Sequence, residues 1–404
     1  MRIAEINMMH IGSTGKIMFG IAQTASMLGH EVYTFSPRYY QRGKKFEDVK
    51  IPNHFFFGSS EENKIHYILA EATGLHGYGS FVGTKQLIKK LETIKPDILH
   101  LHNLHNMSIN LPMLFSYIKK RNIKTVWTLH DCWPITGKCP YFDIVKCRKW
   151  MNGCYKCPVL HEYPKAYIDI VREMWKFKRK WFTGIKNMIL VSPSIWLAEN
   201  VKKSYLSVYP IKVINNGIDL SIFKPVIKID VYKKYGISSD KKIVLGVSFD
   251  WGKRKGLDAF IELSKRLSDE YQIVLVGTNE SVDKILPSSI ISVHRTQNQN
   301  ELAEIYSISN VYVNPTREDN FPTVNLEALA CGTPVITYNT GGSPECIDDS
   351  CGICVECDDY DSLTEKICYV CEDKAFSSSD CVKKASNYEQ NACYKKYIDL
   401  YQSM

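Results

Sequence analysis

The sequence VYVNPTREDNFPTVNLEALACGTPVITYNTGGSPE, residues 311–345, decides the fold class of this chain. It begins with a short β-branched run at 311–315, continues with helix-like spacing at 325–330, and returns to an apolar run at 334–338. Short and nearly continuous apolar strands are typical of a parallel sheet that is buried on both faces. A strand, a helix and a second strand in this order predict one β-α-β unit of an α/β fold.

The same alternation continues in both directions along the chain. Further strand-like runs lie at 2–7, 31–35, 97–102, 124–130, 187–193, 241–249 and 271–277. The segment NNGIDLSIFKP, 215–225, is rich in Asn, Gly and Pro and separates two periodic blocks. We therefore expect two doubly wound domains, at 1–215 and 216–385, with a C-terminal helix at 386–404 that packs back on the first domain. Ligands are expected where the carboxyl ends of the strands of both domains face a common cleft.

The composition is that of a folded protein with a mild positive charge. Of the 404 residues, 45% are hydrophobic and 23% are charged, and the formal net charge is +8. This excess is too diffuse to indicate a nucleic-acid partner, but it suits anionic ligands or a lipid surface. No run approaches the ~18 apolar residues of a membrane-spanning helix. The N-terminus lacks the apolar core of a signal peptide, so we expect a cytoplasmic protein.

Three acids and two glycines mark a candidate ligand site within residues 311–345. Glu318 and Asp319 follow the first strand, and Glu327 lies in the helix, eight residues beyond Asp319. This spacing of slightly over two helical turns lets both side chains face one site, where carboxylates would bind hydroxyls and the helix N-terminus would bind phosphate. Gly341 and Gly342 would let the backbone approach a ligand. The alternative is that Glu327 is a solvated helix residue and that the glycines only turn the chain.

A cluster of positive charge follows the strand at 241–249. Lys253, Arg254 and Lys255 stand directly before a helix that we predict from about Gly256 to Leu267. Three cations beside a helix N-terminus suit a diphosphate leaving group, because fixed positive charge there stabilises the transition state more than the ground state. The alternative is a basic, solvated turn.

Five ordered motifs resemble those of the retaining glycosyltransferases of family 4, which have the GT-B fold. The acids and the helix after them resemble the E-x7-E element and the EA-x-A-x-G-x-PVI run of that family. GKRKGLDAFIEL is similar to the family's phosphate-binding helix start, and VINNGIDLSIFKP is similar to its interdomain segment. GSTGKI is similar to its N-terminal glycine loop, and TLHDCWP is similar to its HD strand end. The resemblance implies an α/β chain of two Rossmann-like domains that face a central cleft.

The resemblance also implies roles for individual residues. Glu327 would accept hydrogen bonds from the ribose hydroxyls of the donor. Asp319, or Glu318 if the alignment slips by one residue, would hold the donor sugar, and His130 would line the cleft near sugar and acceptor. The other candidates for donor binding are Gly12, Gly15, Gly277, Phe321, Pro322, Thr323, Gly341 and Gly342.

One departure from the family concerns the diphosphate site. The family usually has an arginine at the position of Asp250, and we expect Arg254 or Lys253 to replace it beside Lys255. Because these cations can serve the diphosphate and no D-x-D element follows a strand, the sequence predicts catalysis without a metal ion. The resemblance implies same-face attack assisted by the leaving phosphate, so no protein nucleophile is assigned.

Five cysteines lie in a loop-rich insert at 132–157 that follows His130, and the four after Cys132 are candidate metal ligands. They are Cys139, Cys147, Cys154 and Cys157, and the last two form a C-x2-C pair. Reduced thiols in such a segment suit tetrahedral zinc, and four thiolates would leave no open coordination position, so the zinc would be structural. The alternative is four independent buried thiols.

Residues 165–186 combine seven basic and two acidic residues with interleaved tryptophan and phenylalanine. This mixture is typical of an interfacial helix on an anionic membrane leaflet. The alternative is a solvated helix whose aromatic side chains pack inward.

The combined prediction is a hexosyltransferase that retains anomeric configuration. The donor, a nucleotide-diphosphate sugar, would bind the C-terminal domain, and a saccharide or lipid-linked saccharide acceptor would bind the N-terminal domain. Surface polysaccharide biosynthesis at the inner face of the plasma membrane, with peripheral membrane contact, is the expected setting. Two alternatives are a sugar-nucleotide 2-epimerase of the same architecture and a non-catalytic nucleotide-sugar-binding protein.

Overall fold

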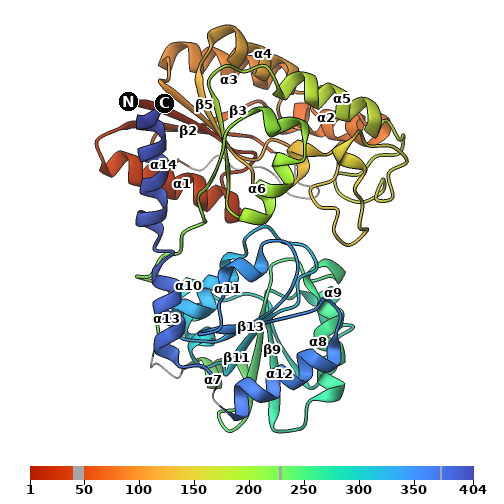
Figure 1. The fold of residues 1–404 in the computed structure, drawn as a ribbon, viewed down its shortest axis with the longest axis vertical. Coiled ribbons are helices and arrows are strands. Elements are labelled where there is room, and N and C mark those ends of the chain that lie inside the picture. The colour runs from red at the N-terminus through yellow and green to blue at the C-terminus, as the bar shows by residue number, and fades with distance from the viewer. Residues whose placement is uncertain (40–49, 227–229, 374) are drawn as a thin grey trace. The chain divides into compact units, whose positions relative to one another are not determined.

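The computed structural model describes residues 1–39, 50–226, 230–373 and 375–404, which form two compact units (Figure 1). Unit 1 comprises Met1–Asn215 and Asn391–Met404, and unit 2 comprises Asn216–Gln390. The last helix of the chain begins at Gln390, four residues later than the expected start at residue 386, because a separate helix ends at Ser386 (390 − 386 = 4).

Unit 1 is built on a parallel sheet of seven strands with the order β3-β2-β1-β4-β5-β6-β7. The strands are β1 (Arg2–Ile6), β2 (Glu31–Pro37), β3 (His54–Phe57), β4 (Ile98–Leu101), β5 (Lys124–Thr128), β6 (Met188–Ser192) and β7 (Ile211–Val213). The strand order runs outward from β1 on one side and from β4 on the other. The carboxyl ends of β1 and β4 therefore form a topological switch point, the usual ligand position in such sheets.

The helices of unit 1 cover both faces of this sheet, with α3 and α4 on one face and α1 and α14 on the other (Figure 1). They are α1 (Gly12–Met27), α2 (Ser60–Thr73), α3 (Phe81–Ile94), α4 (Leu111–Arg121), α5 (Val171–Phe182), α6 (Ile195–Lys202) and α14 (Gln390–Ser403). Because side chains alternate along a strand, Leu99 and Leu101 of β4 join the apolar core under α3 and α4, while His100 faces the other way.

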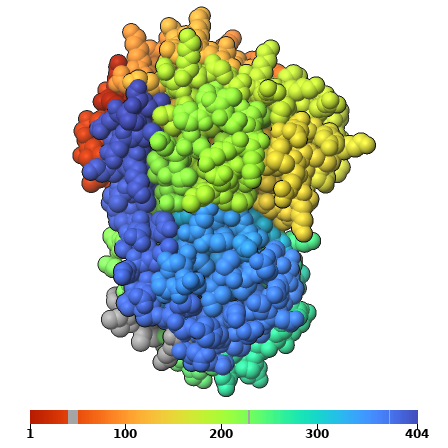
Figure 2. Space-filling view, viewed as in Figure 1, coloured from red at the N-terminus to blue at the C-terminus, as the bar shows by residue number. Residues whose placement is uncertain are grey.

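The C-terminal helix α14 packs on unit 1 through aromatic side chains. The Tyr401 hydroxyl lies 2.7 Å from His100 Nδ1, and the Tyr397 hydroxyl accepts a hydrogen bond from Thr128 at 3.4 Å. Gly20 of α1 leaves room for Tyr394, whose ring would lie 2.3 Å from a Cβ at that position. In Figure 2, this helix is drawn dark blue on the surface of unit 1. Residues from the end of the chain thus complete the face of the sheet that carries His100.

Unit 2 is a parallel sheet of six strands with the order β10-β9-β8-β11-β12-β13. The strands are β8 (Lys242–Val247), β9 (Tyr271–Val276), β10 (Ile290–Val293), β11 (Val311–Asn314), β12 (Val335–Tyr338) and β13 (Gly352–Val355). The helices are α7 (Asp230–Tyr235), α8 (Leu257–Arg266), α9 (Glu280–Asp283), α10 (Gln299–Ser307), α11 (Thr323–Ala330), α12 (Tyr360–Glu372) and α13 (Ser378–Ser386). Two apolar clusters, one including Leu245 and Leu329 and the other Phe260 and Ile336, form its core. The switch point of this sheet lies between β8 and β11.

Helix α5 does not expose the aromatic face that the sequence suggested. Trp175 and Trp181 are each 8% exposed and Phe182 is 0% exposed, and Trp175 Nε1 donates a hydrogen bond to the Trp150 carbonyl at 2.8 Å. The assignment of this helix to a membrane interface is therefore wrong, because the side chains that would enter a membrane are core residues. The alternative of inward-packed aromatics is the observed one. Within the described residues, no helix has both the length and the apolar character needed to cross a membrane.

Candidate functional site

The two charged motifs of unit 2 meet at the switch point of its sheet. β8 leads into a 3-10 turn at Lys253–Lys255 directly before α8, and β11 leads into the loop 315–322 before α11. β8 and β11 are hydrogen-bonded neighbours, so the segments after their carboxyl ends lie side by side. The fold thereby joins motifs that are far apart in sequence at the place where doubly wound sheets bind ligands.

Backbone and side-chain contacts connect the turn to the loop. The Arg317 N–H donates to the Arg254 carbonyl at 2.9 Å, and the Arg254 guanidinium donates to the Glu318 carbonyl at 3.2 Å. Lys255 Nζ lies 2.5 Å from Asp319 Oδ2, and these two side chains are 14% and 18% exposed. The structure therefore brings the predicted lysine and the predicted acid into direct contact.

Arg317 anchors this arrangement and was not among the predicted site residues. Its guanidinium donates to both carboxylate oxygens of Asp258 at 2.8 Å, to Asp358 at 2.6 Å and to the Lys253 carbonyl. The side chain is 5% exposed; burial opposes its charge, but hydrogen bonds to Asp258 and Asp358 raise its pKa. Arg317 therefore ties the loop after β11 to α8 and to the turn before it. A basic residue beside an acid pair at a strand end was the available sequence signal.

Glu327 lies in α11, where the spacing predicts it. The Tyr306 hydroxyl donates a hydrogen bond to Glu327 Oε2 at 3.2 Å. Burial, and then the charges of Glu327 and Asp319, raise the pKa of Tyr312, so both carboxylates lie in the electrostatic neighbourhood of one buried phenol. Pro322 occupies the N-cap position of α11 and provides no side-chain cap, and a helix N-terminus is a place where anions are favoured.

The glycines predicted near the donor are explained by packing inside unit 2. Gly341 has φ +58°, and a Cβ there would lie 1.9 Å from the Asp319 carbonyl oxygen. Gly277 has φ +87°, and a Cβ there would lie 1.8 Å from the Ser248 carbonyl oxygen. The Gly342 N–H donates to the Asp319 carbonyl at 3.2 Å. Gly341 and Gly342 thus pack on the loop that carries Asp319, and Gly277 packs on the segment after β8, while direct contact with a ligand stays a prediction.

The remaining predicted residues of unit 2 lie around the start of α11. Phe321 is 3% exposed and its ring lies 5.7 Å from that of Tyr388. Pro322 occupies the N-cap position of α11, and Thr323 is the first residue of the helix. Lys253 is exposed and Arg254 is partly exposed. Arg254 pairs with Asp250 at 3.9 Å, so the acid at the usual arginine position of the family meets a cation from the next turn.

In unit 1, Gly12 and Gly15 lie in the first turn of α1 and not in a loop before it. Gly15 is required by packing, since a Cβ there would lie 2.7 Å from the backbone carbonyl carbon of His10. Gly12 has φ +75°, and, its chain neighbours and the backbone of its own helix aside, no atom of the described residues lies within 4 Å of the place where its Cβ would stand. The expected glycine loop is thus a helix start, with open space only at Gly12.

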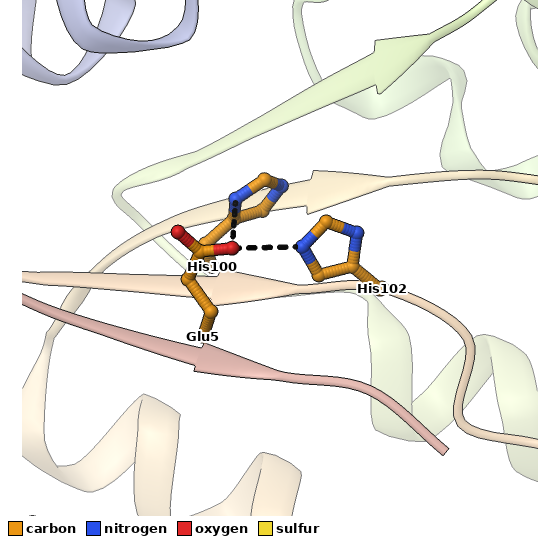
Figure 3. Close-up of side chains that lie close together, drawn as sticks. All are labelled: Glu5, His100 and His102. Carbon is orange, nitrogen blue, oxygen red and sulfur yellow. Dashed lines mark hydrogen bonds and ion pairs between the residues drawn. The ribbon is translucent and has the colours of Figure 1, made fainter. Parts of the chain in front are cut away.

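His130 is part of a buried chain of polar side chains. His130 Nε2 lies 3.0 Å from His102 Nδ1, and His102 Nε2 lies 3.3 Å from Glu5 Oε2. His100 Nδ1 lies 3.8 Å from the same oxygen (Figure 3). Glu5, His100 and His102 are 0% exposed and His130 is 9% exposed. Glu5 was not predicted, because an isolated acid in a short apolar strand gives no signal of its partners.

Burial shifts the pKa values of the side chains in this buried network. Burial raises the pKa of Glu5 well above its ordinary value and lowers the pKa values of His100 and His102. It also lowers the pKa of His130 to about 4, although the charge of Asp131 opposes the shift. Burial therefore disfavours the charged form of the acid and of each imidazole in this network.

Glu5, His100 and His102 are the one group of three ligand-type side chains in the described residues whose ligand atoms lie within 4.8 Å of one another. The ring nitrogens already have other partners. His100 Nε2 lies 2.8 Å from Thr128 Oγ1, and its Nδ1 faces Tyr401. His102 lies between Glu5 and His130. This arrangement favours a hydrogen-bond network over a metal site.

Asp131 fixes the other side of this strand end. Its Oδ2 lies 2.8 Å from His105 Nε2 and accepts from Asn103 Nδ2 at 3.3 Å, and its Oδ1 accepts from the Trp133 N–H at 2.9 Å. Burial opposes its ionisation, but His105 and the Trp133 N–H lower the pKa of Asp131. The insert after Asp131 contains the four predicted zinc ligands Cys139, Cys147, Cys154 and Cys157, all free thiols that line one cavity.

Two sequence families match this chain. Residues 15–222 match Glycosyltransferase Family 4, and residues 229–392 match Glycosyl transferases group 1. The chain is 26% identical over 271 residues to the "Putative colanic acid biosynthesis glycosyl transferase WcaC" of Escherichia coli, with 64% of each chain covered. It is 25% identical over 277 residues to an N,N'-diacetylbacillosaminyl-diphospho-undecaprenol alpha-1,3-N-acetylgalactosaminyltransferase of Campylobacter jejuni, covering 63% of this chain and 72% of that protein.

Solved structures share the fold over the whole chain. Sucrose-phosphate synthase from Thermosynechococcus elongatus has a TM-score of 0.72 at 18% identity, with coverage of 100% of this chain and 98% of the other. Anabaena HepE, in complex with UDP-glucose, has a TM-score of 0.69 at 12% identity and 100% coverage of both chains. The expected α/β class with two Rossmann-like units is confirmed. Because the match at residues 15–222 takes in more than half of the 404 residues, this chain belongs to glycosyltransferase family 4 and has the GT-B fold.

Proposed function

We propose that the protein is a retaining glycosyltransferase that moves a hexosyl group from a nucleotide-diphosphate sugar to a saccharide or lipid-linked saccharide. The observation that carries this proposal is the contact of 2.5 Å between Lys255 and Asp319 at the switch point of unit 2. A cation for the diphosphate and an acid for sugar hydroxyls are adjacent there. The N-termini of α8 and α11 begin beside them and add positive ends for phosphate.

In this proposal each charged group of unit 2 has one task. Lys255, with Arg254 and Lys253, stabilises the charge that develops on the leaving diphosphate. Asp319 holds the sugar hydroxyls, since its carboxylate lies next to Lys255. Glu318 is the weaker candidate, because it is buried and only 7% exposed. Glu327 accepts hydrogen bonds from the ribose, and Tyr306 orients its carboxylate.

Unit 1 would bind the acceptor and would present His130 to the reacting sugar. Because the pKa of His130 is about 4, its imidazole is neutral at physiological pH and acts as a hydrogen-bonding group. No protein nucleophile is proposed. The cationic turn supplies the charge that a metal ion supplies in other transferases, so we expect turnover to persist when divalent cations are chelated.

The names of the relatives suggest the acceptor. The protein from Campylobacter jejuni is named for a diphospho-undecaprenol-linked substrate, and WcaC is named for colanic acid biosynthesis. We therefore propose a lipid-linked acceptor in surface polysaccharide biosynthesis, at the cytoplasmic face of the plasma membrane.

Exposed apolar side chains on α2, and not on α5, support contact with a membrane surface. Ile65, Ile68 and Leu69 lie on one face of α2 and are 60%, 52% and 54% exposed. Phe81 and Val82, at the start of α3, are 56% and 61% exposed. The Val82 N–H donates to Glu62 on α2 at 2.7 Å, so the two helix segments are adjacent. Exposed apolar patches of this kind mark interaction surfaces.

A panel of UDP- and GDP-sugars tests the function directly. The true donor should raise the melting temperature by mass action, and adding a lipid-linked saccharide should then release nucleotide. Formation of an epimerised sugar nucleotide from donor alone would instead support the 2-epimerase. Binding of a donor with no nucleotide release under any acceptor would support the non-catalytic alternative.

A further inference from the structure

We propose that Cys139, Cys147, Cys154 and Cys157 together bind one structural zinc ion in unit 1. This inference is independent of the proposed transferase activity. It rests on the packing of the insert after β5, which forms the yellow edge of unit 1 in Figure 2.

The four thiols surround one small space. A cavity of about 20 Å³ is lined by all four cysteines, together with Lys138 and Trp150 among others. A cavity needs roughly 10–15 Å³ to hold one water molecule, so this one has room for a single small occupant. All four thiols border this cavity, and Cys139 and Cys147 each interact electrostatically with Cys154 and Cys157. Four cysteines spread over nineteen positions of the sequence thus line one cavity.

Backbone N–H groups already point at two of the sulfurs. The Gly137 N–H donates to Cys154 Sγ at 3.1 Å, and the Val159 N–H donates to the sulfur of Cys157. Such bonds stabilise a thiolate and orient it toward a metal. Gly137 makes its contact possible, because a Cβ there would lie 2.5 Å from the Val171 carbonyl oxygen and 3.0 Å from Cys154 Cβ.

Two buried lysines supply the charge that a four-thiolate zinc site needs. Zinc with four thiolates carries a net charge of −2. Lys178 is 0% exposed and interacts electrostatically with Cys154 and Cys139, and Lys138 is 2% exposed and interacts with Cys157 and Cys139. Lys178 also faces Asp131, and Lys138 also faces the acids Glu162 and Asp169. Lys138 Nζ donates to the Val159 and Glu162 carbonyls at 2.8 and 2.7 Å, and Lys178 Nζ donates to the Trp133 carbonyl, so both ammonium groups are fixed in place in this segment.

Zinc suits this set of ligands better than other metals do. Four soft sulfur ligands without a carboxylate or imidazole select zinc or iron–sulfur centres, and with no open position zinc is structural. No three of the four sulfurs fall within the 4.8 Å spacing that holds for Glu5, His100 and His102, so zinc binding would draw the thiols closer together. Zinc would make the start of the insert, directly after His130 and Asp131, more rigid. That segment is tied to the cysteines by two hydrogen bonds: the Cys132 N–H donates to the Pro140 carbonyl at 2.8 Å, and the Thr136 hydroxyl donates to the Cys139 carbonyl at 2.6 Å.

The test is the metal content of the full-length protein, purified under reducing conditions with zinc in the growth medium. We expect one zinc ion per chain, and a large loss of zinc in Cys154→Ser and in Cys157→Ser. Cys354→Ser, which removes an exposed cysteine of unit 2, and Cys132→Ser, which removes a buried cysteine outside the set, should keep the zinc. Replacement by cobalt should give the strong visible absorption of tetrahedral thiolate coordination.

A second measurement covers the case in which a serine variant does not fold. In the wild-type protein, a mercurial that titrates thiols should release the zinc to a chromogenic chelator as four thiols react. The proposal is overturned if zinc-loaded protein holds well under one zinc per chain, if iron and labile sulfide are found in its place, or if the folded serine variants keep their zinc. None of these outcomes depends on sugar transfer, so they leave the proposed function to its own test.

Discussion

The Lys255 ammonium group pairs with Asp319 at 2.5 Å and is proposed to bind the leaving diphosphate as well. Lys255→Ala should lower kcat/KM on the order of 10²–10³-fold, as expected when one preorganised positive or hydrogen-bonding group is removed from a developing anion. Steady-state kinetics with the donor identified by the panel measure this effect. Lys265→Ala, which removes an exposed lysine of α8 paired with Glu262, should stay near wild type. Near-normal turnover of Lys255→Ala would remove it from the site.

Glu327 is proposed to act through its charge on the ribose. Glu327→Gln keeps the size of the side chain but weakens charge-assisted hydrogen bonds of about 1.5–3 kcal/mol, which corresponds to about 10–100-fold in kcat/KM for the donor. Tyr306→Phe removes one bond to Glu327 and leaves its charge, so its effect should be smaller. Donor binding measured by calorimetry checks both variants. Equal affinity of wild type and Glu327→Gln for the donor would contradict the ribose role.

At the scale of single elements, α2 and α5 should respond differently to mutation. The double change Ile65→Ser and Leu69→Ser should weaken binding to vesicles of anionic lipid and leave the melting temperature nearly unchanged, because both side chains are more than half exposed. Sedimentation with vesicles measures this binding, with Ile285→Ser on the surface of unit 2 as the control. Full vesicle binding by the double variant would show that α2 is not a membrane contact.

Trp175→Ala in α5 should act on stability and not on vesicle binding. The side chain is 8% exposed, packs against Tyr205 at 5.2 Å and donates to the Trp150 carbonyl, so its removal should cost about 3–5 kcal/mol of unfolding free energy. Urea unfolding measures this loss. A stable variant that no longer binds vesicles would restore the interfacial assignment.

At the scale of the whole molecule, buried histidines are concentrated in unit 1. Burial lowers the pKa of eight histidines of unit 1, which are the fully or nearly buried His66, His76, His100, His102 and His130 and the less buried His10, His30 and His54. The pKa falls to about 4 for His54, His66 and His130 and to about 3 for His76. The one histidine of unit 2, His294, is half exposed. The two units should therefore differ in their response to acid.

Acidification from pH 7.5 to pH 5.5 should destabilise unit 1 more than unit 2. In this window the unfolded chain binds protons that the folded chain cannot, so stability falls with pH, by up to about 1.4 kcal/mol per pH unit for each histidine. Asp131, with a lowered pKa, acts in the same direction. Glu5 and Asp143, whose pKa values burial raises, oppose it but are fewer.

Urea unfolding at pH 7.5 and pH 5.5 measures this difference. Tryptophan fluorescence reports mainly on unit 1, because six of the seven tryptophans lie there and only Trp251 lies in unit 2. The loss of nucleotide-sugar binding reports on the unfolding of unit 2. Between pH 7.5 and pH 5.5, the urea midpoint seen by fluorescence should fall more than the midpoint seen by nucleotide-sugar binding. Equal shifts of both transitions would contradict the assignment of the buried, neutral histidines.

The sequence by itself determined the features that depend on local spacing. The strands β1, β4, β5, β6, β8, β9, β11 and β12 all fall within predicted apolar runs, because short β-branched runs between helical periods read directly as buried parallel strands. The strands β3, β7 and β10 were not predicted; they are short and lie at or near sheet edges, where burial leaves a weaker pattern. The position of Glu327 in a helix and of Lys253–Lys255 before a helix follows from the same local periodicity.

Only the tertiary structure decided which distant residues share a neighbourhood. The bonds of Arg317 to Asp258 and Asp358, the chain from Glu5 to His130 and the inward packing of Trp175 each join segments far apart in sequence. An amphipathic pattern predicts which side of a helix is apolar but not what covers that side. A helix whose aromatic face contacts a membrane and one whose aromatic face packs in the core therefore have the same sequence pattern. Buried polar groups take their partners from neighbouring strands and helices, and that choice is made by strand order and register, which no single segment encodes.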